Sequence, residues 1–153
     1  MTELEGMQAA LNEARAAEEA DEVPIGAVVL FDGRIIARGQ NRVLRDNDPT
    51  AHAEMVALRT AALAIGNYRL AGCTVVSTLE PCAMCAGAMI HARIDRLVFA
   101  ADDPKAGAAG SVLGVLNHAA LNHQMRLDRG LLAEESTALL REFFQRRRSL
   151  PKA

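Results

Sequence analysis

The sequence predicts an α/β fold in which helices pack against a sheet. Stretches with apolar residues at helical spacing alternate along the chain with short apolar runs typical of buried strands. Hydrophobic residues make up 50% of the 153 residues, which is enough for a sizeable core. The sequence shows no internal repeat and no long linker, so we expect one domain over residues 1–153.

A helix, a hairpin and a second helix are expected in the N-terminal half. Residues 25–30 are apolar on both faces, as in a central strand. Asp32-Gly33 is typical of a tight hairpin turn. Thr50 is expected to cap the second helix, and Gly66 to end it. The expected bounds are 4–20 and 51–65 for the helices, and 25–30 and 34–39 for the strands.

Strands and helices are expected to alternate in the C-terminal half as well. Pro81 suits the first turn of a helix. Ser111 is expected to cap a short helix that follows a loop rich in glycine and alanine. The expected bounds are 74–78, 97–101 and 125–127 for strands, and 81–91 and 131–148 for helices. The last helix carries an apolar stripe made by Leu132, Leu139, Leu140, Phe143 and Phe144.

Charge and aromatic content exclude some classes of function. The formal net charge is −2, so any contact with RNA must use local patches. With no Trp, one Tyr and four Phe, a broad stacking platform for single strands is not expected, but a small pocket for one base is compatible. We find no secretory signal and no apolar run of the about 20 residues that cross a bilayer. The number of cysteines is odd, which does not favour a framework of disulfides. We therefore expect a cytoplasmic protein.

Metal-ligating residues occur in two short segments. Cys82 and Cys85 lie three apart, so on a helix they share one face and can bind one ion. His52 adds an imidazole, and thiolates with imidazole are the ligands that zinc prefers. Both segments are expected to begin helices, whose N-termini favour the thiolate. Because His52 and Glu54 lie two apart, they can converge only at the tip of a helix.

The number of ligands indicates a catalytic zinc. Two cysteines and one histidine leave a fourth position for water, whereas a structural zinc has four protein ligands. Zinc lowers the pKa of a bound water to about 7. Glu54 could then transfer the proton of that water. In the alternative interpretation Cys73 completes the shell, but Cys73 precedes an apolar strand, where a buried free thiol is more common.

The order His-x-Glu and then Pro-Cys-x-x-Cys resembles that of the zinc-dependent cytidine/deoxycytidylate deaminase superfamily. Within this superfamily, nearly the whole chain is similar to the bacterial tRNA-specific adenosine deaminases. The stretches that carry the resemblance are 23–28, 48–54, 67–70, 78–82, 85–91, 107–111, 122–123 and 143–144.

The resemblance implies a cytidine deaminase-like fold, a reaction and an assembly. The fold would be a three-layer α/β/α arrangement with a five-stranded mixed sheet, assembled as a homodimer. Each subunit would bind one Zn²⁺ through His52, Cys82 and Cys85, with Glu54 as the proton shuttle. The substrate would be the wobble adenosine of a tRNA anticodon stem-loop, hydrolysed to inosine with release of ammonia.

The resemblance also implies contacts with the substrate. Asn41 would read a base edge, because an amide both donates and accepts hydrogen bonds, although an asparagine after a strand is also a common turn residue. Val28 would form either an apolar wall of the base pocket or part of the core, and the backbone of Ala53 would bond the base. The other expected RNA contacts are Asp103, Lys105, Arg45, Arg69, Phe144 and Arg147, with Arg146 and Arg148 as further candidates.

Four positions depart from the family pattern in loops expected to face RNA: Gln40, Val43, Asp102 and Ala106. Two competing functions stay open at this point. A deaminase of a free base or nucleotide, such as cytosine or guanine, would use the same metal motif. A zinc- or RNA-binding module without catalysis would not need Glu54.

Overall fold

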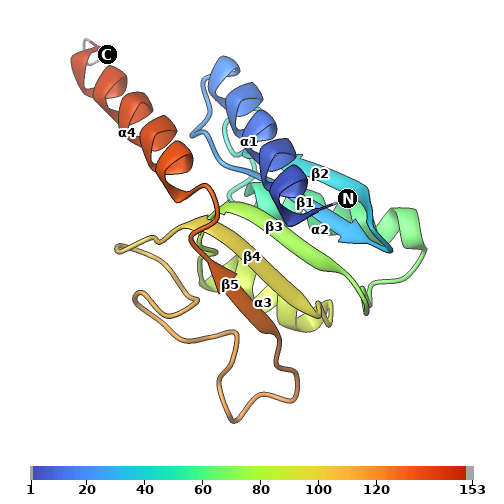
Figure 1. Cartoon of the computed structure of the whole chain (residues 1–153). Coiled ribbons are helices and arrows are strands. Elements are labelled where there is room, and N and C mark those ends of the chain that lie inside the picture. The colour runs from blue at the N-terminus through green and yellow to red at the C-terminus, as the bar shows by residue number, and fades with distance from the viewer. Residues whose placement is uncertain (1, 151–153) are drawn as a thin grey trace.

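The computed structural model describes residues 2–150 and shows five strands in one mixed sheet with helices on both faces (Figure 1). The order of strands is β2-β1-β3-β4-β5. β1 is antiparallel to β2 and β3, whereas β3, β4 and β5 are parallel. The elements are α1 (Glu3–Glu19), β1 (Gly26–Phe31), β2 (Arg34–Gln40), α2 (Ala53–Ile65), β3 (Thr74–Leu79), α3 (Ala83–His91), β4 (Arg96–Ala101), β5 (Arg126–Arg129) and α4 (Ala133–Ser149). The expected three-layer mixed-sheet fold is confirmed.

Alternation along β1 builds the two cores. Ala27 and Val29 belong to the apolar cluster shared with α2 and α3, whereas Val28 and Leu30 belong to the cluster under α1. All four are 8% exposed or less, as expected for a central strand. The two-residue turn at Asp32 and Gly33 has positive φ at both positions (52° and 73°), as the Asp-Gly pair predicts.

The two helices that carry the metal-ligating residues at their N-termini start two residues later than expected. Thr50 does not cap α2, because its hydroxyl and its N–H both donate to Asp48 Oδ1 (2.7 and 2.8 Å) in a turn outside the helix. His52 is the N-cap of α2. Pro81 does not lie in the first turn of α3 either, because that helix begins at Ala83 and has Cys82 as its N-cap. Gly66 ends α2 in the left-handed conformation, as expected.

The segment between β4 and β5 also differs from the expectation. Residues 102–125 form turns and an isolated bridge, and no helix follows Ser111. The Ser111 hydroxyl and N–H both donate to Glu80 and therefore cap nothing. β5 follows as the edge strand, one to two residues later than expected.

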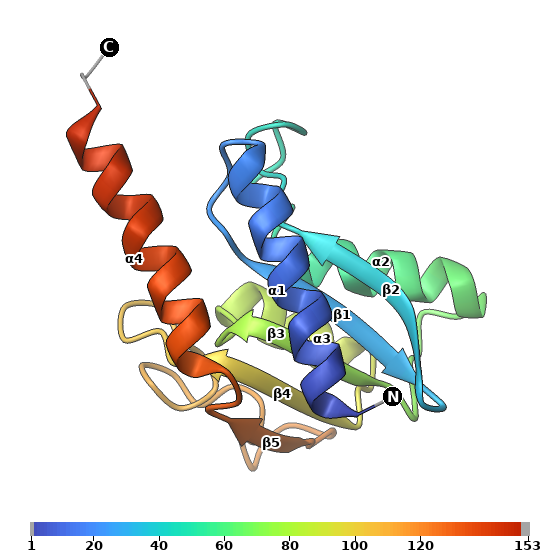
Figure 2. The ribbon, with the colours of Figure 1, turned by 45° about the horizontal axis from the view of Figure 1, so that its top comes forward.

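α4 begins against the sheet and ends away from it. The Ser136 hydroxyl donates to the carbonyl of Thr78 in β3 (2.5 Å), and Leu139 packs against the cluster under α1. Figures 1 and 2 both show the C-terminal half of α4 projecting beyond the sheet. Within residues 2–150, no helix is long and apolar enough to cross a membrane.

Candidate metal centre

The parallel strands β3 and β4 bring two segments to one edge of the sheet. Leu79 at the end of β3 pairs with Ala101 at the end of β4. Cys82 follows Leu79 by three residues, and the long segment 102–125 follows Ala101. Both therefore lie at the carboxyl edge of these strands, where open α/β sheets place their ligand sites.

Three side chains converge between the first turns of α2 and α3. His52 Nδ1 lies 3.5 Å from Cys82 Sγ and 3.6 Å from Cys85 Sγ, and the three ligand atoms all lie within 4.8 Å of one another. His52 is an N-cap with extended backbone (φ −69°, ψ 155°), so it leaves the helix direction. His52 therefore lies at the tip of α2, which is the place where the sequence predicts that His52 and Glu54 can converge.

The arrangement fits a zinc ion. Zinc–nitrogen bonds of about 2.0 Å and zinc–sulfur bonds of about 2.3 Å at tetrahedral angles separate the two kinds of ligand atom by about 3.5 Å. The His52–Cys82 and His52–Cys85 distances match this separation. Among residues 2–150, His52, Cys82 and Cys85 form the one group of histidine, cysteine or carboxylate side chains with this spacing.

The two cysteines share their protons unequally. A hydrogen bond from Cys85, together with one from His52, lowers the pKa of Cys82 to about 3 despite its burial. The same Cys85–Cys82 hydrogen bond, together with burial, raises the pKa of the Cys85 thiol. Cys82 is therefore a thiolate at neutral pH, whereas Cys85 would have to lose its proton to ligate a dication. Binding of a dication is thus coupled to proton release.

Glu54 is buried beside this cluster in the first turn of α2. Its side chain is 4% exposed, and burial raises its pKa to about 7. It does not belong to the group of ligand atoms. A carboxyl whose pKa lies near neutrality can both take and give a proton, which is the role expected from the sequence.

Cys73 does not complete the shell. It precedes Thr74 at the start of β3, whereas the ligand cluster follows the end of that strand. Six residues of strand separate the two ends by about 20 Å. Burial raises the pKa of Cys73 to about 11, so it is a neutral core thiol. The alternative of a closed, four-ligand structural zinc is therefore wrong.

Glu80 is a part of the site that sequence reasoning missed. It is 1% exposed, and its carboxylate accepts hydrogen bonds from the N–H groups of Asp103, Ala109 and Ser111 and from the Ser111 hydroxyl. These partners lie 23–31 residues further along the chain. Gly107 leaves the space for this contact, since a Cβ there would lie 2.4 Å from Glu80 Cδ. Glu80 thus fixes the segment after β4 next to Cys82.

Two of the expected base contacts flank the loop that leads to the centre, since Asn41 begins this loop and Ala53 follows the ligand His52 at its end. Asn41 follows β2, is 6% exposed, and accepts a hydrogen bond from Val43 N–H on its Oδ1 (3.3 Å). Ala53 is the first residue of α2 and lies between His52 and Glu54. Val28, in contrast, is fully buried in the cluster under α1, on the opposite face of the sheet from α2 and α3. These surroundings are those of a core residue, which is the alternative role expected for Val28.

Three expected RNA contacts line one cavity. Asp103, Lys105 and Phe144 surround a space of about 360 Å³ together with Ile25 and Leu79. Phe144 is 44% exposed, whereas its neighbour Phe143 is 5% exposed, so one ring packs in the core and the other faces this cavity. A cavity of this size is in the range of small-ligand sites.

The expected arginine contacts differ in their surroundings. Arg69 lies on the surface against Tyr68, donating to its hydroxyl (3.1 Å). Arg147 stacks on Phe143 and donates to the carbonyl of Asp21 (2.6 Å). Arg45 is bonded to buried Glu22. The contacts of these three residues with phosphate stay predictions.

Comparison with known proteins identifies the family. Residues 1–101, which include His52, Glu54, Cys82 and Cys85, match the cytidine and deoxycytidylate deaminase zinc-binding region. The chain belongs to this family. The resemblance drawn from the sequence motif is therefore confirmed, and the domain has a His/Cys/Cys group positioned to hold one metal ion.

Relatives of this deaminase domain cover nearly all of the chain. The tRNA-specific adenosine deaminase of Haemophilus influenzae is 49% identical over 95% of this chain and 85% of that protein. A solved tRNA:A34 deaminase, studied for A-to-I editing at the wobble position of transfer RNA, is 48% identical with a TM-score of 0.86, over 89% of this chain and 99% of that one. The guanine deaminase of Nitrosomonas europaea is 30% identical with a TM-score of 0.80, over 92% and 83%.

Zinc content should distinguish the three cysteines. We expect about one zinc per chain in the wild-type protein, and loss of most of it after Cys82→Ser or Cys85→Ser, because two remaining ligands hold a dication weakly. Cys73→Ser should keep the wild-type content, since Cys73 lies at the other end of β3. Elemental analysis of protein purified without added metal measures this. Loss of zinc from Cys73→Ser would contradict the three-ligand centre.

Proposed function

We propose that this deaminase hydrolyses the wobble adenosine of a tRNA anticodon to inosine. The observation that carries the proposal is the combination of an open His–Cys–Cys centre and a buried Glu54 in a chain 49% identical to a tRNA-specific adenosine deaminase. An open centre beside a proton shuttle supports catalysis, and the extent of identity supports adenosine in tRNA as the substrate.

Each residue of the centre has a role in this hydrolysis. His52, Cys82 and Cys85 would hold the zinc, which when bound supplies a water activated at neutral pH. Glu54 would take one proton of that water and give it to the ring nitrogen of adenine. It would then carry the second proton of the same oxygen to the amine, which leaves as ammonia while the oxygen remains as the carbonyl of hypoxanthine. Its pKa of about 7 suits it to both transfers. Because Glu54 is almost completely buried, bulk water does not compete for the proton.

Residues around the centre would place the RNA. Asn41 has its side-chain oxygen bonded within its own loop, which leaves the amide N–H groups as the donors for a base edge. The cavity lined by Asp103, Lys105 and Phe144 is suited to a base flanking the adenosine, with Phe144 as a stacking surface. The net charge of −2 agrees with binding through such local contacts rather than through a basic face.

Inosine formation on a synthetic anticodon stem-loop tests the proposal. We expect the wild-type protein to convert only the wobble adenosine and to leave free cytosine, guanine and adenine intact. The second candidate, a free-base deaminase, has the 30% identity to a guanine deaminase in its favour. Turnover of guanine or cytosine without turnover of the stem-loop would establish that candidate instead.

Substitution of Phe144 tests the cavity. We expect Phe144→Ala to raise KM for the stem-loop by about five- to 150-fold, because stacking of a base on an aromatic ring contributes about 1–3 kcal/mol. Phe31→Ala is the matched control: it is 41% exposed, similar to the 44% of Phe144, but lies at the hairpin on the opposite edge of the sheet. An equal KM in the two variants would remove the cavity from the RNA site.

We propose further that residues 1–153 form a single domain that works in the cytoplasm as a homodimer, as the family resemblance implies.

Gly87 and Ala88 are partly exposed on α3, and a Cβ at Gly87 would meet open space, so another helix can approach closely there. Sedimentation should give a dimer. Gly87→Arg should shift the protein toward monomer if this face is the interface.

A further inference from the structure

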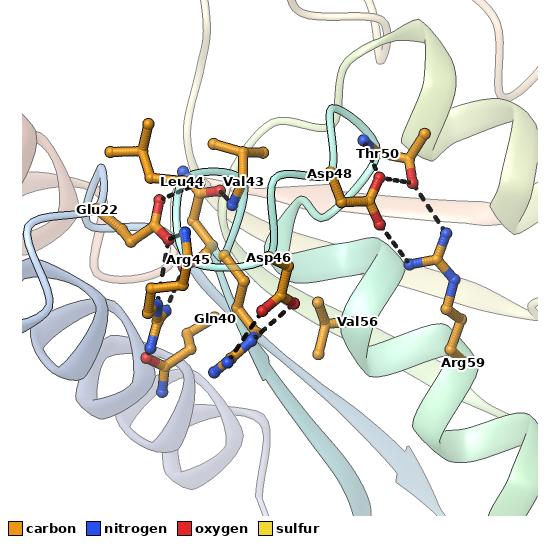
Figure 3. A network of polar contacts seen from close by, with 12 residues as sticks. Glu22, Gln40, Val43, Leu44, Arg45, Asp46, Asp48, Thr50, Val56 and Arg59 are labelled. Atoms are coloured by element: carbon orange, nitrogen blue, oxygen red, sulfur yellow. Dashed lines mark hydrogen bonds and ion pairs between the residues drawn. The ribbon is translucent and has the colours of Figure 1, made fainter.

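A buried carboxylate outside the metal centre holds the loop that leads to it. Glu22 lies between α1 and β1 and has no exposed surface. It accepts hydrogen bonds from Leu44 N–H (3.1 Å), Arg45 N–H (3.0 Å) and Arg45 Nε (3.1 Å). Figure 3 shows these contacts converging on one side chain. Glu22 therefore fixes the middle of the loop formed by residues 41–52, which connects β2 to α2.

Arg45 extends this contact to the beginning of the loop. Its Nη2 donates to Gln40 Oε1 (3.0 Å) and to the backbone carbonyl of Asn41 (2.5 Å). Gln40 Nε2 in turn donates to Glu13 of α1 (3.2 Å). One guanidinium thus connects the buried carboxylate, the end of β2 and Asn41. The fork of nitrogen donors that arginine offers makes this possible, and lysine has no equivalent.

The ends of the same loop carry the functional residues. Asn41 N–H donates to the carbonyl of Ile25 (3.2 Å). Arg42 N–H donates to the carbonyl of Ala51 (2.9 Å), the residue before the metal ligand His52. The position of Asn41 relative to the metal centre therefore depends on the conformation that Glu22 and Arg45 impose on the residues between them.

We propose that Glu22 and Arg45 form a clamp that positions Asn41 beside the metal centre, and that both are positioning residues for the substrate. The proposal rests on the proposed function through the role of Asn41. Stability alone would not require an ion pair here, since apolar residues of similar volume commonly replace buried ion pairs without loss. Directed bonds to Leu44, Arg45 and Asn41 instead select one conformation of the loop.

Kinetics on the anticodon stem-loop test the clamp. We expect Arg45→Ala to raise KM about tenfold and to leave kcat within about threefold, because the metal centre and Glu54 are unchanged. Arg45→Lys should restore the wild-type KM only in part. Arg42→Gln is the matched control, because Arg42 pairs with Asp46 inside the same exposed loop (3.0 and 3.2 Å) and should behave as wild type.

A double variant tests whether the two residues act together. Removal of Arg45 leaves the Glu22 carboxylate buried without its cation, and Glu22→Gln removes that charge. The double variant Glu22→Gln with Arg45→Ala should therefore raise KM no further than Arg45→Ala alone. If the two substitutions raise KM by factors that multiply in the double variant, Glu22 and Arg45 act independently, which would contradict a clamp.

Amide hydrogen exchange in the zinc-loaded protein provides a readout that does not depend on the substrate. We expect Arg45→Ala to speed exchange in residues 41–51 about tenfold and to leave α2 unchanged, whereas Arg42→Gln changes neither. Unchanged exchange in Arg45→Ala overturns the clamp, as does faster exchange with an unchanged KM. A wild-type protein without activity on the stem-loop contradicts the proposed function instead, and exchange then decides by itself whether Arg45 holds the loop.

Discussion

Replacing Glu54 by Gln is expected to lower turnover of the anticodon stem-loop by about 10²- to 10⁴-fold and to leave zinc bound. Glutamine has nearly the same shape, so the packing around this 4% exposed side chain is retained. It cannot carry a proton between water and adenine. Because Glu54 is not among the three ligands, metal content should stay at the wild-type value. Initial rates and elemental analysis on the same preparation measure both quantities.

The same variant separates catalysis from a purely structural role of the centre. A module that binds zinc or RNA without chemistry would lose nothing on Glu54→Gln. Glu54→Ala should be as inactive as Glu54→Gln, although it removes more atoms, because both lack the carboxyl group. Wild-type turnover in either variant would exclude Glu54 as the proton shuttle, whereas a wild-type protein that binds zinc but shows no turnover would favour the non-catalytic alternative.

Glu54→Gln should stabilise the metal-free protein at alkaline pH, although it lowers turnover. Burial raises its pKa from 4.5 to about 7 in the folded state, so the folded state holds the proton more tightly than the unfolded one. Loss of that proton opposes folding increasingly as the pH rises from 4.5 to about 7. Metal-free Glu54→Gln should therefore melt above the metal-free wild type at pH 8 and lose this advantage near pH 4, as thermal unfolding at both pH values would show.

The layers of the fold follow from local signals in the sequence. Two-sided apolar character placed β1 in the centre, and Asp32-Gly33 specified the turn because both positions need positive φ. The expected start of α2 is wrong by two residues for a local reason as well, since Asp48 competes for the hydroxyl and N–H of Thr50. That small error matters, because it moves His52 from the interior of a helix to its N-cap.

The metal ligands could be predicted because their chemistry is carried by residue type and spacing. Glu80 and Glu22 could not, because each is satisfied by backbone N–H groups 22–31 residues further along the chain. Such donors leave no trace in residue identity. The ion pair of Arg45 with Glu22 could not be predicted for the same reason, and the contact of Arg45 with phosphate stays a prediction.

Gly39→Ala is expected to destabilise the protein strongly, although Gly39 is not a catalytic residue. A Cβ at Gly39 in β2 would lie 2.2 Å from the carbonyl oxygen of Ala53 and 2.6 Å from the N–H nitrogen of Ala57. Both are backbone atoms of α2, so the helix must move for the methyl group to fit. We expect a loss of about 3 kcal/mol in the free energy of unfolding, at the upper end for overpacking. The melting temperature should fall by about 6–12 °C.

The same displacement should reach the chemistry, because the first turn of α2 holds His52 and Glu54. A shift of about 1 Å in a catalytic group costs about a hundredfold in rate. Gly114→Ala is the matched control, since a Cβ there meets no atom within 4 Å and Gly114 has no positive φ. Thermal unfolding and turnover of both variants measure the effect. If Gly39→Ala melts and reacts like Gly114→Ala, then direct packing of α2 on β2 does not set the position of Glu54, and another contact must hold the carboxyl group beside the ligands.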